Sequence, residues 1–280
     1  MQKTLTLNKP LGKTPLEVLE EYKNKQPEYA DIKMAYAGRL DPMAEGKLLV
    51  LVGEECKKRD KYLNLDKEYE FEVLLGVSSD TSDILGITDF STITKPERVS
   101  VAGLDFWTRL DHVIKNLQGK QNFPYPAFSS KTVEGKPLFL WALENKLHEI
   151  QIPTKEAEVY SLRHIETTLI KSSDLHTQIQ TKIDRITPVV VESKQLGQDF
   201  RRKEVLKTWE NNLNLEEIQE REFTVLKFRC VCSSGTYMRT LASIIGKELG
   251  SAGLAWSITR TKIGNFKKIF RGFGLWTKQY

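Results

Sequence analysis

Apolar and polar positions alternate in several short stretches of this chain and predict β-strands. Residues 69–75 alternate most cleanly, with aromatic and aliphatic side chains on one face and two glutamates on the other. Residues 4–8 and 223–232 alternate in the same way. Residues 48–53 instead form a continuous apolar run that ends at a glycine, which is typical of a buried strand.

Other stretches place apolar residues at helical spacing. We expect helices near residues 106–117 and over residues 199–213 and 236–249. A further helix should begin at Thr14, where a threonine cap is followed by a proline and, three residues after the cap, by a glutamate. Because strands adjoin strands as often as helices, the order favours an α+β protein with a mixed sheet over strict βαβ alternation.

Two regions carry weaker patterns. Residues 123–139 are rich in proline, aromatic residues and serine, and predict an ordered loop or hairpin. Residues 172–222 are the least regular part, although a short apolar run at residues 189–191 fits a strand. No internal repeat or low-complexity linker divides the chain, so we expect a single domain over residues 1–280.

Composition narrows the class of protein. Hydrophobic residues make up 40% of the 280 residues and charged residues 28%, as in soluble globular proteins. The net charge of +5 permits an anionic partner. Three cysteines are too few for a disulfide framework, and the four histidines lie apart without metal-ligand spacing. Without a signal peptide or an 18-residue apolar run, we expect a cytoplasmic protein with no metal and no membrane span.

The segment Gly-Arg-Leu-Asp-Pro-Met-Ala-Glu-Gly at residues 38–46 is the most informative stretch. It holds the carboxylate of Asp41 between a rigid proline and flanking glycines, with Arg39 two residues earlier. Glycine permits unusual backbone conformations and close approach to a ligand, and Pro42 biases Asp41 away from helix. Such a loop can present one acid at a fixed place. An ordinary surface turn would use the same residues, so other parts of the sequence are needed to tell a functional loop from a turn.

Six motifs stand in a fixed order along the chain. They are NKPLGKT (8–14), GRLDPMAEG (38–46), DKEY with LGVSSDTSD (66–69 and 75–83), PAFSSK to GKPL (126–138), CSSGTYMRT (232–240) and ITRTKIG (258–264). Their order and spacing resemble the TruB family of tRNA pseudouridine synthases over roughly residues 5–266. The resemblance implies an α+β pseudouridine synthase fold, with a central mixed, mostly antiparallel sheet flanked by helices and loops. It further implies isomerisation of a uridine in the T-arm of tRNA, at position 55 of the T-loop.

The implied reaction agrees with the absence of cofactor motifs. Pseudouridine formation breaks the N1–C1′ bond of a uridine, turns the base and rejoins it through C5. No redox or hydrolytic step occurs, so we expect no cofactor. The base must leave its stack to be reached. The enzyme then needs a carboxylate, a proton acceptor and a surface that holds the flipped base.

By resemblance, Asp41 is the catalytic carboxylate. It acts in its ionised form, either by attacking the sugar or by stabilising a detached base. Arg239 matches the arginine that pairs with this acid in the family, where an opposite charge fixes the carboxylate's rotamer. Arg239 should lie in the first turn of its helix, where the dipole disfavours cations, and this argues against an ordinary surface arginine. Arg39 is a rival partner because of its proximity in sequence.

Further positions match residues that contact the substrate in the family. Tyr69 matches the catalytic tyrosine that stacks on the target base and handles a proton, although a core aromatic would fit the same pattern. Tyr237 and Ile258 match residues beside the base. Lys9 matches a motif that shapes the floor of the site, and a solvated turn lysine is the alternative.

Residues 123–148 resemble the family's RNA-gripping loop. Lys131 lies there among aromatic residues, which suits folded or single-stranded RNA, although hydrophobic anchoring of the loop is an equal alternative. Basic residues also gather at positions 57–61, at 201–203, and from Arg260 to position 271. Most such clusters are solvated faces, but near an RNA enzyme some contact phosphates, and we include Arg260 among the substrate contacts.

The chain also departs from the family's pattern. Tyr36 and Ala37 stand where the family usually has histidine and threonine, and Tyr36 can fill the same space by stacking. Thr259 replaces a usual arginine. Residues 172–222 are longer than in the family and form an atypical insertion. Residues 267–280 form a short tail where bacterial relatives commonly add a small RNA-binding domain, which we expect to be absent or reduced to a remnant.

Three hypotheses follow. The first is a monomeric uridine-to-pseudouridine isomerase for tRNA. The second is a catalytically weak RNA-binding or RNA-folding protein of the same fold, and the third is a pseudouridine synthase for another RNA. The joint presence of Asp41, Tyr69 and Arg239 argues against the second, because a binding module needs none of them. The Tyr36 substitution and the short tail leave the third open.

Overall fold

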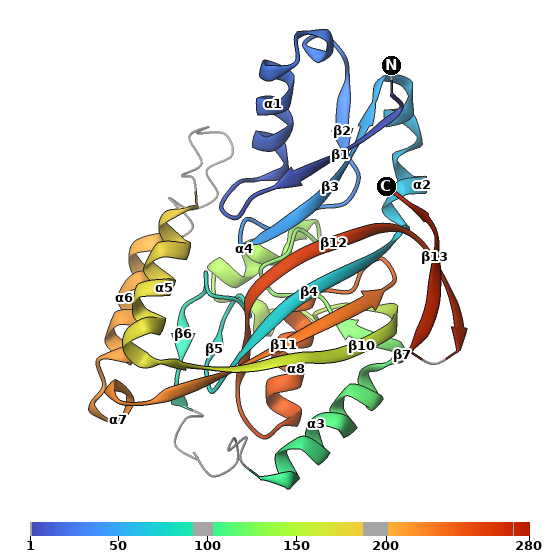
Figure 1. The fold of residues 1–280 in the computed structure, drawn as a ribbon. Helices are drawn as coiled ribbons and strands as arrows, with labels where there is room; N and C mark the ends of the chain where they lie inside the picture. The colour runs from blue at the N-terminus through green and yellow to red at the C-terminus, as the bar shows by residue number, and fades with distance from the viewer. Residues whose placement is uncertain (1, 92–102, 187–200, 271) are drawn as a thin grey trace.

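The fold is built on a central nine-stranded sheet. The computed structural model describes residues 2–91, 103–186, 201–270 and 272–280. The strand order is β1-β3-β12-β4-β11-β10-β7, with β2 beside β3 and β13 beside β12 (Figure 1). The strands of this sheet are β1 (Thr4–Lys9), β2 (Met34–Tyr36), β3 (Ala44–Val52), β4 (Asp66–Leu75), β7 (Gly119–Pro124), β10 (Thr154–Lys171), β11 (Glu222–Cys232), β12 (Gly253–Phe270) and β13 (Phe273–Gln279). All neighbours pair antiparallel except β3 and β12, so the predicted mixed, mostly antiparallel sheet of an α+β protein is confirmed.

Helices surround this sheet, and two small ribbons project from it. The helices are α1 (Pro15–Lys25), α2 (Arg59–Leu63), α3 (Leu104–Leu117), α4 (Leu138–Leu143), α5 (Ser172–Asp184), α6 (Arg202–Leu213), α7 (Glu216–Gln219) and α8 (Met238–Glu248). The ribbons pair β5 (Ser78–Ser79) with β6 (Thr88–Asp89), and β8 (Thr132–Val133) with β9 (Lys136–Pro137). The largest core joins apolar residues of the sheet to those of α3, α5, α6 and α8. Phe71 and Phe228 stack at its centre, with ring centroids 5.4 Å apart.

Most elements predicted from the apolar pattern are confirmed. The cap of α1 is a full capping box, because the Glu17 amide donates to the Thr14 hydroxyl (3.2 Å) and the Thr14 amide donates to the Glu17 carboxylate (2.6 Å). The predicted helix over residues 199–213 is confirmed from Arg202 onward, and residues 199 and 200 lie outside the described part of the chain. The possible strand at residues 189–191 also lies outside it.

The prediction for the last helix was wrong at its start. Residues 236 and 237 precede α8 rather than open it, because the chain turns at Gly235 (φ 94°) and stays extended at Tyr237 (φ −102°, ψ 119°). As a result, Arg239 is the second residue of α8 and lies in its first turn, as expected.

Two long elements were not predicted. β10 runs for 18 residues, but register shifts near Val159 and His164 interrupt its alternation. β13 pairs with the end of β12 and so extends the sheet in the expected tail. The chain segment that connects β10 to β11 contains α5, α6 and α7, and these three helices contact one another. Residues 123–139 contain the β8–β9 hairpin, as the proline-rich pattern indicated.

The parallel pairing of β3 with β12 brings the Asp41 loop beside a distant segment. Ala44 lies opposite Ile258, and Gly46 lies opposite Arg260. Gly46 has φ 103°, and a Cβ there would come within 2.3 Å of the Arg260 carbonyl oxygen. Only glycine therefore lets the two strands approach at this point. This contact fixes the loop at residues 38–46 against β12.

Candidate active site

A cavity of about 450 Å³ collects most of the predicted site residues. Its lining comes from the loop at residues 38–46, the start of β4, the loop before α8, and β12. Seven of the predicted positions lie on this lining, namely Arg39, Asp41, Tyr69, Tyr237, Arg239, Ile258 and Arg260. These residues are up to 221 positions apart in sequence, since 260 − 39 = 221. The sheet order, which places β3, β12, β4 and β11 side by side, brings them together.

Hydrogen bonds from the end of β1 and the segment after it fix the backbone of the loop that carries Asp41. The Gly12 amide donates to the Pro42 carbonyl (2.9 Å), and the Ala44 amide donates to the Asp41 carbonyl (3.0 Å). The Lys9 ammonium is fully buried and donates to the carbonyls of Pro10 (3.1 Å), Lys13 (2.6 Å) and Pro42 (3.4 Å). Lys9 thus lies beneath the loop and not on the cavity lining, where it fixes the backbone that presents Asp41.

Burial makes Lys9 sensitive to pH. Burial lowers the pKa of Lys9 to about 8 from 10.5, against the opposing charges of Asp41 and Glu45. Between these values the unfolded chain holds a proton that the folded chain lacks, so the stability contributed at Lys9 rises with pH and is constant below 8. We expect the free energy of unfolding of the wild type, relative to Lys9→Met, to increase by about 2 kcal/mol from neutral pH to about pH 10.

Urea unfolding of both proteins at each pH measures this difference, and Lys25→Met is the control. Lys25 is exposed near the end of α1, so its replacement should leave the pH dependence unchanged. A constant difference between wild type and Lys9→Met over this range would contradict the low pKa of Lys9.

Asp41 forms an ion pair with Arg239. Asp41 Oδ2 lies 2.9 Å from Arg239 Nη2, and the side chains are 40% and 6% exposed, respectively. Arg239 also donates to the carbonyls of Thr81 (3.0 Å) and Phe128 (3.3 Å). Arg39 instead donates to the Ser130 hydroxyl. Of the two arginines that the sequence offered as partners of Asp41, the structure therefore pairs Arg239 with it. A half-exposed carboxylate is therefore held by a guanidinium that is itself fixed on several sides.

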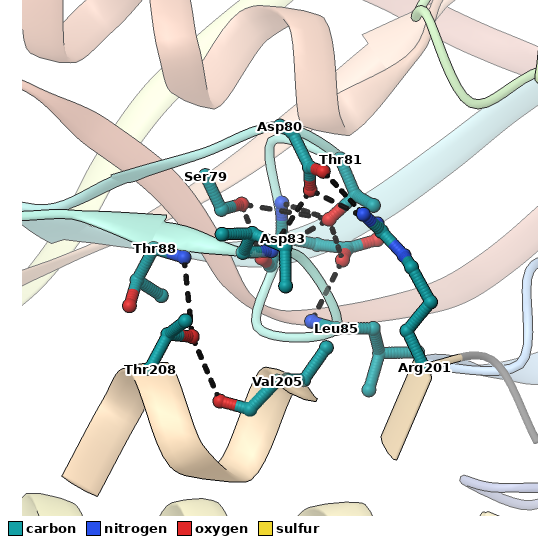
Figure 2. A network of polar contacts seen from close by, with 10 residues as sticks. Ser79, Asp80, Thr81, Asp83, Leu85, Thr88, Arg201, Val205 and Thr208 are labelled. Atoms are coloured by element: carbon teal, nitrogen blue, oxygen red, sulfur yellow. Dashed lines mark hydrogen bonds and ion pairs between the residues drawn. The ribbon is translucent and has the colours of Figure 1, made fainter. Parts of the chain in front are cut away.

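A second carboxylate supports Arg239 from the protein interior. Asp83 Oδ2 lies 3.7 Å from Arg239 Nε. Asp83 Oδ1 accepts hydrogen bonds from the Thr81 hydroxyl (2.6 Å) and the Leu85 amide (2.9 Å) (Figure 2). Burial raises the pKa of Asp83, although Arg239 and Thr81 favour its charged form. Burial works to lower the pKa of Arg239, but the charges of Asp41 and Asp83 outweigh it and raise that pKa. The guanidinium stays charged between the two acids.

Sequence reasoning gave no role to Thr81 or Asp83, and it treated Phe128 only as an aromatic neighbour of Lys131 that suits RNA stacking or anchors the loop. All three lie inside motifs that were identified, but nothing in the local pattern showed that they would meet Arg239. The available signal was an aspartate in a turn-rich stretch directly after a buried strand. Such an aspartate is usually exposed, but Asp83 is buried, next to Arg239 of α8 and Ala255 of β12.

Tyr69 and Arg260 form the opposite side of the site. Burial raises the pKa of Tyr69 to about 12, and the nearby Arg260 guanidinium opposes this shift. The phenol is therefore protonated near neutral pH. Arg260 is buried and donates to the carbonyls of Lys47 (2.7 Å) and Arg39 (3.1 Å). Within the described part of the chain its buried Nη2 makes no hydrogen bond, and the guanidinium lies close to the Tyr69 phenol.

Besides Lys9, two predicted substrate contacts lie away from the cavity lining. Tyr36 lies on β2 and packs against the cluster of Val18 and Leu48 beside α1. Lys131 is exposed, 5.5 Å from the centre of the Tyr125 ring. The centre of the Tyr125 ring lies 5.8 Å from that of Tyr237, which lines the cavity, so Lys131 lies near the cavity without lining it.

Neither a metal centre nor a membrane span emerges from the described residues. No group of three or more histidine, cysteine, aspartate or glutamate residues lies close enough there to hold a metal ion. No helix of the described segments is both long and apolar enough to cross a membrane. The site instead offers a fixed carboxylate on a cavity that Tyr69 and Ile258 also line.

Comparisons with known proteins point to one family. The model described as "TruB family pseudouridylate synthase (N terminal domain)" matches residues 25–185, which include Asp41 and Tyr69. The "tRNA pseudouridine synthase B" of Syntrophomonas wolfei is 28% identical over 263 residues, 94% of this chain and 67% of that protein. The enzyme of the same name from Parabacteroides distasonis is 28% identical over 266 residues, 93% of this chain and 85% of that protein.

A eukaryotic relative and a solved structure extend this similarity. The "tRNA pseudouridine synthase 4" of Saccharomyces cerevisiae is 28% identical over 251 residues, and the match spans 82% of this chain and 60% of that protein. The crystal structure of a Cbf5-Nop10-Gar1 complex contains a chain that matches 93% of this one with a TM-score of 0.51. Only 48% of that chain is covered and the sequence identity is 18%, so this likeness concerns the fold alone.

Proposed function

Because the chain belongs to the TruB family of pseudouridylate synthases, we propose that it converts uridine to pseudouridine in tRNA, at position 55 of the T-loop. The observation that carries this proposal is the Asp41–Arg239 ion pair of 2.9 Å on a cavity that Tyr69 also lines. The names of the relatives indicate tRNA as the substrate.

In the proposed reaction, Asp41 acts on a uridine that has left its stack. Its carboxylate either attacks C1′ or stabilises the charge that develops as the N1–C1′ bond breaks. The base then turns and C5 forms the new bond to C1′, while C5 loses a proton and N1 ends with one. Atoms balance without an added group. The protein holds Arg239 in place before the substrate binds. Its positive charge therefore stabilises the Asp41 carboxylate without any movement of the side chain during the reaction.

The residues that line the cavity support binding of the base there. Tyr69 offers an aromatic ring and Ile258 an apolar side chain, and both line the same space. Arg260 also lines the cavity and places a positive charge beside the Tyr69 phenol. Tyr237 lies at the end of the loop before α8 and lines the cavity beside Arg239.

We expect Tyr69→Phe to separate stacking from proton handling. Phenylalanine keeps the ring but lacks the hydroxyl, so tRNA affinity should be unchanged while the single-turnover rate falls about a hundredfold, the usual contribution of a proton-transfer group. The measurement is the rate of pseudouridine formation with enzyme in excess. If Tyr69→Phe reacts at the wild-type rate, Tyr69 serves only as a stacking surface.

The target is tested by mapping pseudouridine. Purified protein is incubated with unmodified total tRNA and, separately, with unmodified ribosomal RNA. Product at the T-loop uridine supports the proposal. Product only in ribosomal RNA would favour a synthase for another RNA, and binding without product would favour an RNA-folding protein.

A further inference from the structure

Arg201 links the helical segment between β10 and β11 to the active-site arginine. It belongs to the basic stretch at residues 201–203, and the proposed reaction gives it no role. We propose that Arg201 is a positioning residue, which clamps together the two segments whose carbonyls fix Arg239. This inference rests on the proposed function of Arg239 as the partner of Asp41.

One side of the clamp is the loop between β5 and β6. Arg201 Nη1 and Nη2 donate to the two carboxylate oxygens of Asp80, at 2.7 and 3.2 Å (Figure 2). Such a bidentate pair fixes direction as well as distance. Asp80 Oδ1 also accepts from the Ile87 amide (2.9 Å), which closes the loop on itself. The next residue, Thr81, provides the carbonyl that accepts from Arg239.

The other side of the clamp is the Phe128 ring. The Arg201 guanidinium carbon lies 4.5 Å from the centre of this ring, a cation–π contact. The carbonyl of the same residue, Phe128, accepts from Arg239 Nη2 (3.3 Å). One guanidinium therefore joins two chain segments immediately beside the two carbonyls that hold Arg239.

The helix that follows Arg201 is anchored to the same loop. Trp209 is buried and donates from Nε1 to the Ile84 carbonyl (3.0 Å), and Asn212 donates to the Thr88 hydroxyl (3.0 Å). Arg201 itself has φ 58°, a left-handed conformation that is costly for a residue with a side chain. Such strain persists only where the surroundings hold it, as at sites that orient a functional group.

A direct contact with RNA phosphate is the competing role for this arginine. A phosphate binds best to an edge of the guanidinium that offers two donors, and Asp80 already occupies the edge formed by Nη1 and Nη2. The ring of Phe128 covers a face of the same group, and the side chain is only 21% exposed. The geometry therefore favours positioning over phosphate binding.

The first test compares Arg201→Ala, Arg201→Lys and Lys203→Ala in single-turnover reactions with a tRNA transcript. We expect Arg201→Ala to lower the rate constant about tenfold, because a small displacement of a fixed group costs rate, while the Kd for tRNA is unchanged. Lysine carries the same charge but has neither the rigid planar fork that matches a carboxylate nor a flat face that stacks on a ring, so Arg201→Lys should resemble Arg201→Ala. Lys203 is exposed on the same helix, and its replacement should have no effect.

Hydrogen exchange provides a readout that does not depend on activity. In Arg201→Ala the amides of Leu85 and Ile87 should exchange faster, while those of β4 and β11 stay protected. In the Asp80→Asn background, where the loop keeps an oxygen for the Ile87 amide, Arg201→Ala should cause little further loss of rate.

The outcomes separate this inference from the proposed function. If the wild type forms no pseudouridine but Arg201→Ala still loosens the loop, the clamp holds and the proposed function fails. The clamp is wrong if rate and exchange both match the wild type. It is also wrong if Arg201→Ala weakens only tRNA binding and Arg201→Lys restores it, because that result would mark a phosphate contact.

Discussion

Asp41→Asn is expected to lower the single-turnover rate of pseudouridine formation by about a thousandfold or more, because it removes the only group proposed to act on the reacting sugar. Asparagine has almost the same shape, so the loop should keep its fold. Lys9 and the Gly12 amide hold the backbone through the Pro42 carbonyl, which the substitution leaves in place. The Kd for tRNA should therefore be close to that of the wild type.

The matched control for this prediction is Glu45→Gln. Glu45 is exposed in the same loop and is not on the lining of the large cavity. Its replacement removes the same charge within four residues of Asp41 and should leave the rate unchanged. A rate for Asp41→Asn within about tenfold of the wild type, which is less than 1.4 kcal/mol of barrier, would exclude Asp41 as the reacting carboxylate.

The second large effect is expected at Arg239. Arg239→Met removes a buried cation and leaves Asp83 buried without its partner, together with the carbonyls of Thr81 and Phe128. Breaking a buried ion pair from one side costs about 3 kcal/mol or more. We therefore expect Arg239→Met to lose both activity and stability, the latter measured by urea unfolding.

The pH dependence identifies the cause of this loss. Burial already raises the pKa of Asp83 above its ordinary value of 3.8, and removal of the guanidinium leaves that effect unopposed. The folded variant then holds a proton that the unfolded chain has released, so its stability falls as pH rises above about 4. Arg239→Met should be closest to the wild type in stability in weak acid and furthest from it near neutral pH.

Two further variants test whether Asp83 is responsible. Asp83→Asn in the Arg239→Met background should recover part of the lost stability, because it removes the unpaired charge. Lys247→Met, on the exposed part of the same helix, should change neither stability nor rate. If Asp83→Asn adds its own loss to that of Arg239→Met, the two residues do not act as a pair.

The local sequence was sufficient to predict those elements that carry a clear pattern within a few residues. The sequence predicted α1 from its capping residues, β4 from its alternation and β3 from its continuous apolar run. Each of these signals lies within a few neighbouring residues. β10 was missed because its bulges break the alternation that marks a strand. The start of α8 was misplaced because Gly235 takes a conformation that the helical spacing of apolar residues does not encode.

The sequence by itself indicated the family and singled out Asp41 and its loop as the candidate reacting group, through one carboxylate between Pro42 and the glycines and five accompanying motifs in order. Only the tertiary structure decided which arginine serves Asp41, that Lys9 supports the loop from below, and that Asp83 and Arg201 contribute to the same network. These contacts join positions 33 to 198 residues apart (42 − 9 = 33; 239 − 41 = 198). Such pairs form through sheet order and helix packing, whereas sequence periodicity reports only on residues a few positions apart.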